Sequence, residues 1–291
     1  MSKVERIRTR SARERIEAQQ AAARRAENRR RIMIAGGSTL IVLALVIGLI
    51  AVRLAQSPAK AGGTASLPAV ARQVTTVPAA AFDKVGAGTA TGLKATTGQP
   101  LLMKNGKPEL LYMGGRYCPF CGAERWAIAT AVSRFGQLSG LHFIHSSPTD
   151  YAPSTPTLDF ARARYSSKYL SFVPVEWYGE KTDPSTPFGH VYFQHPTARE
   201  QALFSKYAGG SFPFVDIGNQ YLVPGAQYAP TALAGLTWAQ VAADLHNPSS
   251  PVAKDIDGAA NMITAAICRL THGQPGGVCT AAGVRAASGS I

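Results

Sequence analysis

Residues 110–136, LLYMGGRYCPFCGAERWAIATAVSRFG, combine a strand, a cysteine motif and a helix in one segment. The first four residues, Leu110–Met113, form a short apolar run that is typical of a buried strand. A helix is expected from Pro119 to about Phe135, because apolar residues recur on one of its faces, and Gly136 is expected as its C′ residue. Two cysteines lie where the strand ends and the helix begins, so this junction is where we expect chemistry.

The motif Cys118-Pro119-Phe120-Cys121 has a spacing that lets two thiols close a disulfide on themselves. At a helix start the first cysteine lies near unpaired backbone N–H groups and the positive end of the helix dipole, and both favour its thiolate. Arg116, two residues earlier, is expected to add positive potential. We therefore predict that Cys118 is the reactive thiol and that Cys121 resolves mixed disulfides.

Two other interpretations of the motif stay open: half of a zinc site, and a purely structural disulfide. Zinc needs two further ligands at suitable spacing, and the sequence has no second C-x-x-C. The remaining cysteines, Cys268 and Cys279, flank a loop rich in Gly and Pro. In an oxidising compartment a structural disulfide between them is the default, and a shuttle toward Cys118 is the alternative. The histidines are scattered, and nothing in the sequence places one near Cys118.

The residues around this segment alternate strands and helices, which predicts a mixed α/β layer architecture. Asn105-Gly106, just before the strand at 109–113, predicts a hairpin with a two-residue turn. Further strands are expected at 141–146, 158–165 and 169–177, helices at 197–206, 238–246 and 253–270, and a second hairpin around Gly218-Asn219.

The N-terminal part of the chain has a different character. Residues 32–52 are 21 positions without a charge, and a helix of this length spans ~30 Å, the thickness of the hydrocarbon core of a bilayer. A cleaved signal peptide has a shorter basic start and a shorter apolar run, so we expect a retained anchor. Seven Lys/Arg in residues 12–31 against three in the 20 residues after the run place the N-terminus in the cytoplasm.

These features predict four parts of the chain. Residues 1–31 are a basic cytoplasmic tail, 32–53 a single transmembrane helix, 54–80 a flexible linker rich in small residues and 81–291 an extracytoplasmic domain. The chain has a net charge of +13, of which +7 falls in residues 1–31, so its basic character gives little support for nucleic-acid binding. We expect contact with the lipid bilayer and no nucleic-acid partner. The single long apolar run excludes a multispanning protein.

The order strand, CPFC, helix, followed much later by Ser211-Phe212-Pro213-Phe214-Val215 and Gly218, resembles the thioredoxin superfamily. The resemblance is closest to membrane-anchored thiol–disulfide proteins of the Dsb type. More narrowly, GGRYCPFCGAERWAIATAVSRFG together with YLSFVPVEW is similar to the domain of unknown function, family number 929, over roughly residues 80–250.

The resemblance implies a thioredoxin-like α/β fold, in which Pro213 is a cis-proline that faces the C-x-x-C and Phe212 offers its backbone to a bound peptide. We expect Arg116 to bind substrate together with Phe212 and Pro213. The 91 residues between Cys121 and Pro213 exceed a minimal thioredoxin, which implies an inserted segment near 146–210.

The expected activity is thiol–disulfide exchange on extracytoplasmic protein thiols. No bound cofactor is expected, because the Cys118–Cys121 pair is itself the redox group, and a membrane partner would reset it. Oxidation, reduction and isomerisation stay open. The alternative is a non-enzymatic binding module of the same fold whose disulfides are only structural. A reactive pair should lie at an exposed helix start beside the proline loop, whereas a structural pair should be buried.

Overall fold

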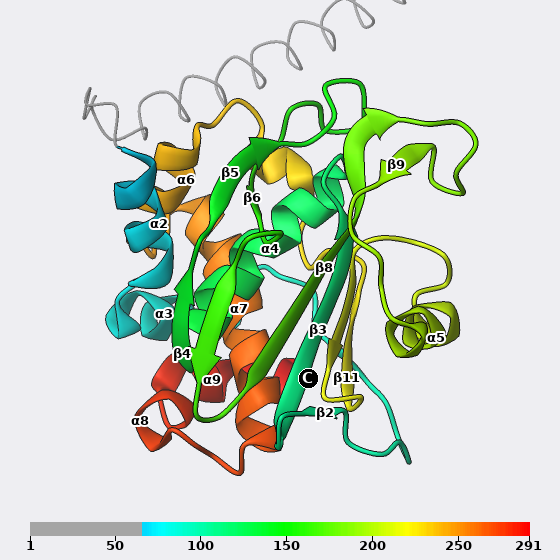
Figure 1. The fold of residues 1–291 in the computed structure, drawn as a ribbon. Helices are drawn as coiled ribbons and strands as arrows, with labels where there is room; N and C mark the ends of the chain where they lie inside the picture. The colour runs from blue at the N-terminus through cyan, green and yellow to red at the C-terminus, as the bar shows by residue number, and fades with distance from the viewer. Residues whose placement is uncertain (1–65) are drawn as a thin grey trace, which may run out of the picture. The chain divides into compact units, whose positions relative to one another are not determined.

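A computed structural model describes residues 66–291, and this part of the chain has the predicted mixed α/β architecture (Figure 1). The predicted tail at 1–31, the predicted span at 32–53 and residues 54–65 of the predicted linker at 54–80 lie outside the described residues. Among the helices of residues 66–291, none combines the length and the apolar character that crossing a membrane requires.

The centre of this region is a mixed sheet of seven strands, in which β3 lies between β8 and β10. β3 runs parallel to β8 and antiparallel to β10, so the sheet combines a parallel centre with antiparallel edges. The order is β1-β11-β10-β3-β8-β9, with β2 also paired to β3. The strands are β1 (Lys94–Ala95), β2 (Met103–Lys104), β3 (Lys107–Gly115), β8 (Ser171–Thr182), β9 (His190–Tyr192), β10 (Phe214–Ile217) and β11 (Tyr221–Pro224).

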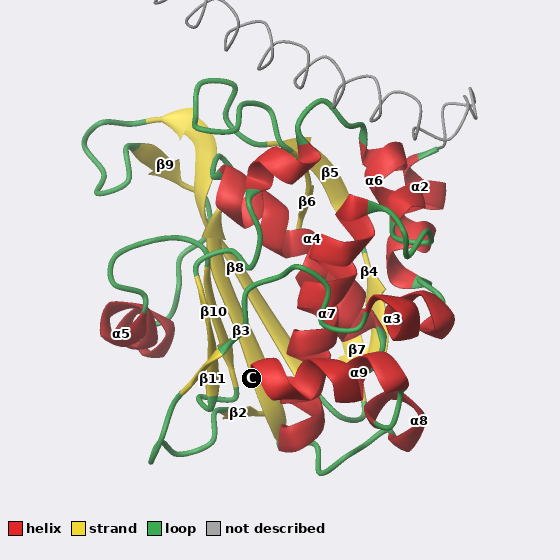
Figure 2. Cartoon of the chain, turned by 180° about the vertical axis from the view of Figure 1, so that it is seen from behind, coloured by secondary structure: helices red, strands yellow, loops and turns green. Residues whose placement is uncertain are grey.

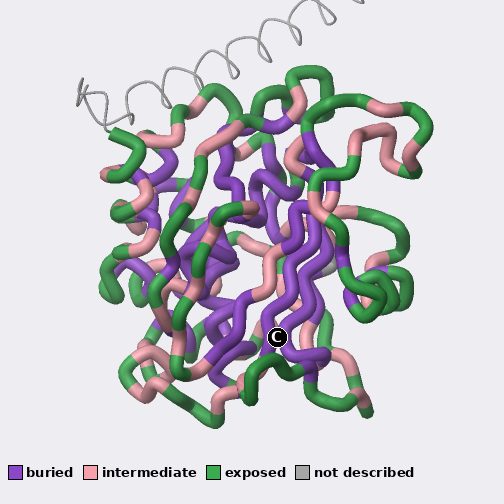
Figure 3. Tube along the Cα trace, in the orientation of Figure 1, coloured by how far each residue is buried: buried purple, intermediate pink, exposed green. Residues whose placement is uncertain are grey.

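Both faces of β3 are covered, which explains why its sequence is apolar without alternation. Leu110 and Tyr112 face a large cluster formed with α4 (Pro119–Ser133) and α7 (Pro251–Leu270). Leu111 and Met113 face a smaller cluster on the other side, which α5 (Ala198–Tyr207) covers with Phe204. Figures 1 and 2 show α5 and the other helices on opposite sides of the sheet, and Figure 3 shows the buried backbone of the central strands. The sheet centre is therefore a rigid support for whatever follows β3.

The predicted linker ends too late. Residues Leu67–Thr75 form helix α2, and Val70 and Val74, four positions apart, are buried in the large cluster. Helix α3 (Ala79–Val85) follows and buries Phe82. The packed region therefore begins before the predicted boundary at 80. The first of these helices was missed in the sequence because two valines four positions apart are a weak pattern among so many small residues. The remaining helices of the large-cluster side are α6 (Trp238–Asp244), α8 (Gly276–Cys279) and α9 (Ala282–Ala287).

Several predicted elements are confirmed. The turn Asn105-Gly106 joins β2 to β3, and both residues have positive φ, 53° and 71°, as a two-residue hairpin of this type requires. Thr197 and Glu200 form a capping box at the start of α5. The hairpin around Gly218-Asn219 joins β10 to β11.

Three predictions differ from the structure. The helix α4 ends at Ser133, and Gly136 begins strand β4 (Gly136–Ser139) instead of closing the helix. The single strand expected at 158–165 is divided between two small sheets, because a turn after Asp159 separates β6 (Pro156–Asp159) from β7 (Arg164–Ser167). β4 pairs with β7, and β6 pairs with β5 (His142–His145).

The third difference concerns the inserted segment expected near 146–210. This segment contains β8, which pairs with β3 at the centre of the main sheet. The segment is therefore not separate from the central sheet. Before β8 it contributes β6 and β7 to the two small sheets, and after β8 it forms β9 of the main sheet and α5.

Candidate functional site

The two motif cysteines lie at the junction between β3 and α4, as predicted. Cys118 is the N-cap of α4, and its Sγ accepts a hydrogen bond from the backbone N–H of Cys121 at 3.3 Å. Pro119 occupies the first helical turn, where its missing N–H costs nothing. The Cys118 N–H donates to the carbonyl of Gly115 at 3.2 Å, which fixes the turn from strand to helix.

The two thiols differ in their acidity. The pKa of Cys118 lies below the ordinary value, chiefly because the Cys121 side chain hydrogen-bonds to it, with further help from the Cys121 backbone N–H and the charge of Arg125; burial opposes these effects. The pKa of Cys121 lies well above the ordinary value, mainly because the side chain is wholly buried. Cys118 is therefore the thiol that ionises first, and a thiolate is the nucleophilic form.

Both cysteines are free thiols and both are buried. Cys118 exposes 7% of its surface and Cys121 exposes none. The helix start is thus less open than a reactive pair was expected to be, and on this criterion alone the pair resembles a structural one. The difference in acidity between the two thiols is instead a feature expected of a reactive pair.

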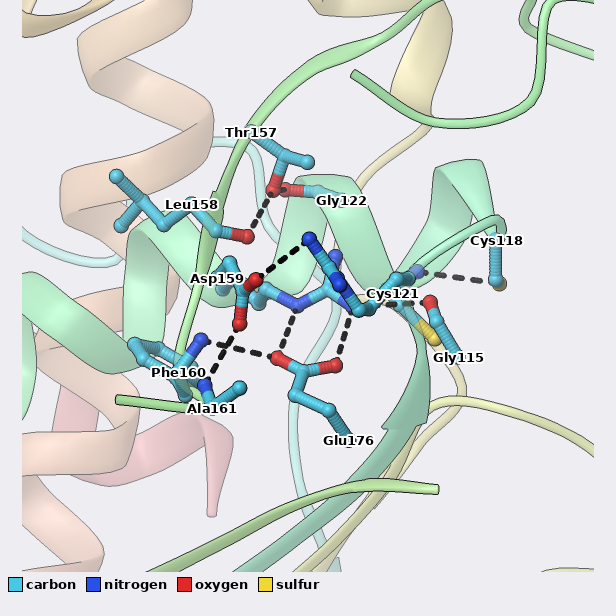
Figure 4. A network of polar contacts seen from close by, with 12 residues as sticks. Gly115, Cys118, Cys121, Gly122, Thr157, Leu158, Asp159, Phe160, Ala161 and Glu176 are labelled. Carbon is cyan, nitrogen blue, oxygen red and sulfur yellow. Dashed lines mark hydrogen bonds and ion pairs between the residues drawn. The ribbon is translucent and has the colours of Figure 1, made fainter. Parts of the chain in front are cut away.

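A buried ion pair lies near the motif, and Figure 4 labels its carboxylate member, Glu176. Arg125 of α4 donates from Nε and Nη2 to the two carboxylate oxygens of Glu176 in β8, at 2.9 and 2.7 Å. The same Nη2 donates to the carbonyl of Gly115 at 2.9 Å, and Glu176 accepts the N–H of Phe160 at 3.1 Å. Arg125 thus joins the start of α4 to β3 and β8, and it brings a full positive charge close to both sulfurs.

Arg116 has a different environment from the one its sequence position suggested. Its Nη2 pairs with Asp159 at 2.9 Å and with Glu180 at 3.3 Å, and its guanidinium lies 4.5 Å from the centre of the Phe193 ring. The cation that lowers the pKa of Cys118 is instead Arg125. Arg125 lies four residues after Cys121 on the same helix, a spacing that could have indicated it. Sequence reasoning missed it because its burial and its pairing with Glu176 depend on the pairing of β3 with β8.

The Phe212-Pro213 peptide bond is cis, as the resemblance implied. Phe214 pairs with Met113, so the antiparallel register places Pro213 beside Gly114, at the end of the sheet from which the cysteine motif starts. Pro213 is buried and lines a cavity of ≈ 390 Å³ with Tyr207 and other residues. Sequence and structure therefore bring the proline and the cysteines to the same end of the sheet.

The Phe212 ring packs into a cluster of aromatic side chains. Its centroid lies 4.6 Å from that of Phe188, 5.0 Å from Phe204 and 6.0 Å from Trp177. The ring is half-buried there, so it belongs to the smaller cluster on the α5 side as well as to the surface near Pro213.

Other aromatic side chains surround the helix start. Phe120 is 39% exposed and stacks on Tyr151, which is 67% exposed. Tyr117, the residue before Cys118, stacks on His190 with 3.6 Å between ring centroids. The sequence placed no histidine near Cys118, since His190 reaches this position only through the hairpin of β8 and β9.

The second cysteine pair is joined, which confirms the predicted disulfide. Cys268 near the end of α7 is bonded to Cys279 in α8, with 5.5 Å between the Cα atoms. Figures 1 and 2 show α8 at the opposite end of the sheet from the start of α4. Within residues 66–291, no group of three or more His, Cys, Asp or Glu side chains is arranged to hold a metal ion.

Residues 96–185 match the model of a family described as Domain of unknown function (DUF929). The expected similarity to this family is thus confirmed over a shorter segment than 80–250. The matched segment contains both motif cysteines, Arg125 and Glu176, and it ends before Pro213. No curated protein matches the chain. No solved structure matches it either.

Proposed function

We propose that the protein is a membrane-anchored thiol–disulfide oxidoreductase that acts on protein thiols outside the cytoplasm. The observation that carries the proposal is the asymmetry of the cysteine pair. Cys118 caps α4 and has a lowered pKa, whereas Cys121 is buried behind it with a raised pKa. One thiol is thus prepared to attack and the other is kept protonated until it is needed.

The exchange reaction needs these two sulfurs and no bound cofactor. When the protein reduces a partner, the Cys118 thiolate attacks one sulfur of the partner's disulfide. The other partner sulfur leaves as a thiolate. Cys121 then loses its proton to water and attacks Cys118. The mixed disulfide breaks, its electron pair leaves with the partner sulfur, and the Cys118–Cys121 disulfide forms. The partner is reduced by two electrons and the pair is oxidised by two. Running backwards, the same steps oxidise a dithiol partner.

The order of the central strands supports a thioredoxin-like domain. β3 and β8 are parallel and are connected through α4, while β10 and β11 continue the sheet antiparallel on the other side of β3. A cis-proline just before β10 and a C-x-x-C just after β3 is the arrangement that the family resemblance implied. Fold alone does not establish activity, so the proposal depends on the cysteines themselves.

The groups proposed to hold a partner lie around the helix start. Phe212 and Pro213 supply backbone beside the end of β3, and Arg116 supplies a cation that is already paired with carboxylates. Exposed aromatic rings at Phe120 and Tyr151 favour an apolar partner segment. We propose that a membrane redox protein resets the pair after each turnover.

A mixed-disulfide trap tests the proposal. In cells that produce the full-length Cys121→Ser variant, Cys118 should accumulate disulfide-linked adducts with other proteins, because the resolving thiol is missing. The matched Cys118→Ser variant should form none, since the remaining cysteine is wholly buried. Equal adduct formation by both variants, or by neither, would contradict an exchange activity.

The direction of exchange follows from the reduction potential of the Cys118–Cys121 pair, measured by equilibration with glutathione. A potential near the strongly oxidising end of the Dsb range would mean that the protein donates disulfides, and one near thioredoxin would mean that it reduces them.

The burial of Cys118 favours a second candidate, a non-enzymatic binding module of the same fold. In that case Cys118 should react with a small alkylating reagent no faster than Cys121 does. The trap separates the two functions, because a binding module would leave the Cys121→Ser variant without adducts.

The membrane anchor and its orientation are part of the proposal, and they depend on the 21 uncharged residues at 32–52 and the basic excess before them. Protease added to intact cells should remove the C-terminal domain and leave the tail. Protection of the domain would reverse the proposed orientation.

A further inference from the structure

Tyr112 on β3 is a fully buried tyrosine with an unusual hydroxyl. Its ring packs in the large cluster, edge-on to Phe160 at 5.5 Å between centroids. Its hydroxyl has no hydrogen-bond partner among the residues that the structure describes. Buried hydroxyl groups are nearly always paired, because an unpaired one has lost its water without compensation. Such a group therefore needs an explanation.

Gly114 shows where the hydroxyl points. A Cβ placed on Gly114 would lie 2.1 Å from the Tyr112 hydroxyl oxygen and 3.1 Å from Cys121 Sγ. Both atoms therefore border the same small space, and they are separated by no more than about 5 Å, the two distances added together. Gly114 does not have a positive φ, so the space, and not the backbone angle, is what requires glycine here. A side chain at this position would collide with the hydroxyl.

The charged and titratable groups around Cys121 are few. Cys118 caps α4, Arg125 lies in α4, Tyr117 precedes the motif, Tyr112 belongs to β3 and Glu176 to β8. Arg125 lies with its guanidinium carbon 5.7 Å from the centre of the Tyr112 ring. Both carboxylate oxygens of Glu176 are bound by Arg125, so Glu176 is not available to accept the proton of Cys121.

We propose that Tyr112 is a positioning residue for the second step of exchange: its hydroxyl donates a hydrogen bond to the Cys121 sulfur as that sulfur loses its proton. The inference rests on the proposed function, since it concerns the resolving step of that reaction. No proton leaves the tyrosine. The proton of Cys121 goes to water, the Cys121 thiolate attacks Cys118, and the partner departs as a thiolate with the electron pair of the broken bond.

Two properties of Tyr112 fit this role. The pKa of its hydroxyl lies well above the ordinary value, chiefly because of burial, so it stays a neutral donor throughout the range in which thiols ionise. Hydrogen bonds to a charged acceptor are about twice as strong as those between neutral groups, so the bond favours the thiolate over the thiol. Arg125 adds its positive charge from α4 in the same direction.

The test separates the two steps of exchange in the full-length protein. Reduced protein is mixed with oxidised glutathione, quenched with acid at intervals and analysed by mass spectrometry. The glutathione adduct at Cys118 reports the first step, and its conversion to the Cys118–Cys121 disulfide reports the second. In Tyr112→Phe the first step should stay within twofold of the unchanged protein. The second should be about tenfold slower at pH 7, with its pH profile moved upward by about one unit.

Tyr228→Phe is the matched control. Tyr228 is also a buried tyrosine in contact with α4, and its hydroxyl donates to the carbonyl of Ala123. This variant loses a structural hydrogen bond, so it should unfold more easily, but the pH profile of the second step should stay in place.

An unshifted pH profile in Tyr112→Phe would overturn the inference, and so would an equal shift in both variants, which would indicate a general effect of packing. Either outcome leaves the proposed function intact. Absence of the glutathione adduct in the unchanged protein would instead contradict the proposed function, and the inference with it.

Discussion

The chain holds two cysteine pairs at opposite ends of one domain, and they differ in almost every physical property. Cys118 and Cys121 are free thiols at the first turn of a helix, next to a buried arginine. Cys268 and Cys279 are joined, 11 residues apart, between the end of α7 and the short helix α8. The first pair differs in acidity between its two members, whereas the second no longer titrates.

This difference shows which physical features support the proposed exchange at the first pair. Close spacing alone brings two sulfurs together in both places. What distinguishes the first pair is a helix start that stabilises one thiolate, a cation beneath it and full burial of the other thiol. The second pair lies near the end of a helix, where the dipole does not favour a thiolate. We therefore expect the two pairs to respond in opposite ways to substitution.

The largest expected effect comes from replacing each cysteine pair in turn, because one replacement should remove exchange and the other should lower stability. Replacing Cys118 and Cys121 with Ser should abolish thiol exchange, measured as glutathione adduct formation. Replacing Cys268 and Cys279 with Ser should leave exchange in place and lower the free energy of unfolding by about 3 kcal/mol, the value that the chain-entropy model gives for a loop of this size. Loss of exchange in the second variant without loss of stability would indicate an electron shuttle between the pairs.

Arg125→Gln should have the next largest effect. It leaves Glu176 charged, buried and unpaired, which costs about 3–5 kcal/mol in comparable sites. It should also raise the pKa of Cys118, because a positive charge beside the thiolate is lost. Denaturant unfolding measures the first effect, and the pH dependence of Cys118 alkylation measures the second.

The double variant Arg125→Gln, Glu176→Gln separates these effects. Two neutral amides remove the unpaired charge, so most of the stability should return while the pKa of Cys118 stays raised. If the free energy of unfolding and the pKa of Cys118 both returned to the values of the unchanged protein, Arg125 would affect Cys118 only by stabilising the fold, and not by its charge.

A smaller effect is expected from Glu124, which lies in α4 three residues after Cys121 and is wholly buried. Burial raises its pKa from 4.5 to about 7 in the folded state. Between pH 4.5 and 7 the folded protein therefore keeps a proton that the unfolded chain has lost, so the free energy of unfolding falls as pH rises through this window. Glu124→Gln should remove this contribution to the pH dependence and raise stability at pH 8 by roughly 3 kcal/mol.

Asp257 provides the corresponding measurement on α7, the helix of the joined pair. Burial raises its pKa to about 8, so stability should continue to fall up to that pH in the Glu124→Gln variant. A flat profile between pH 7 and 8 in that variant would show that the Asp257 carboxyl is better solvated than its surroundings in the fold indicate.

The smallest effect is expected at Arg116, which the sequence had suggested as the cation beside Cys118. In the fold it pairs with the buried Asp159 and the exposed Glu180. Arg116→Gln should therefore leave the pH dependence of Cys118 alkylation unchanged, whereas Arg125→Gln moves it. An equal shift in both variants would restore the sequence-based assignment of Arg116.

Local features of the sequence predicted much of this arrangement. The strand, the motif and the helix at 110–133 depend on apolar patterning and on proline at the first helical turn, both of which act over a few residues. The Cys268–Cys279 bond needed only a short flexible loop between the two cysteines. The cis-Pro213 was predicted from a resemblance and not from its neighbours.

The parts that could not be predicted depend on which strands become neighbours. Arg125 meets Glu176 across 51 positions of sequence, and only the pairing of β3 with β8 brings them together. His190 reaches Tyr117 through the β8–β9 hairpin in the same way. In the sequence, Tyr112 could be recognised only as one residue of an apolar strand. The packing of α4 against β3 is what brings its hydroxyl close to Cys121.

The attachment of Arg125 to Gly115 and Glu176 also matters for protein engineering. It fixes the first turns of α4 from the side opposite to Phe120, which is partly open to solvent and contacts Tyr151. A library of residues at position 120 would therefore vary the surroundings of the Cys118 sulfur while the backbone that carries it is held in place by separate contacts. Such a set of variants would form a calibrated series for measuring how one side chain adjusts the redox behaviour of a neighbouring thiol.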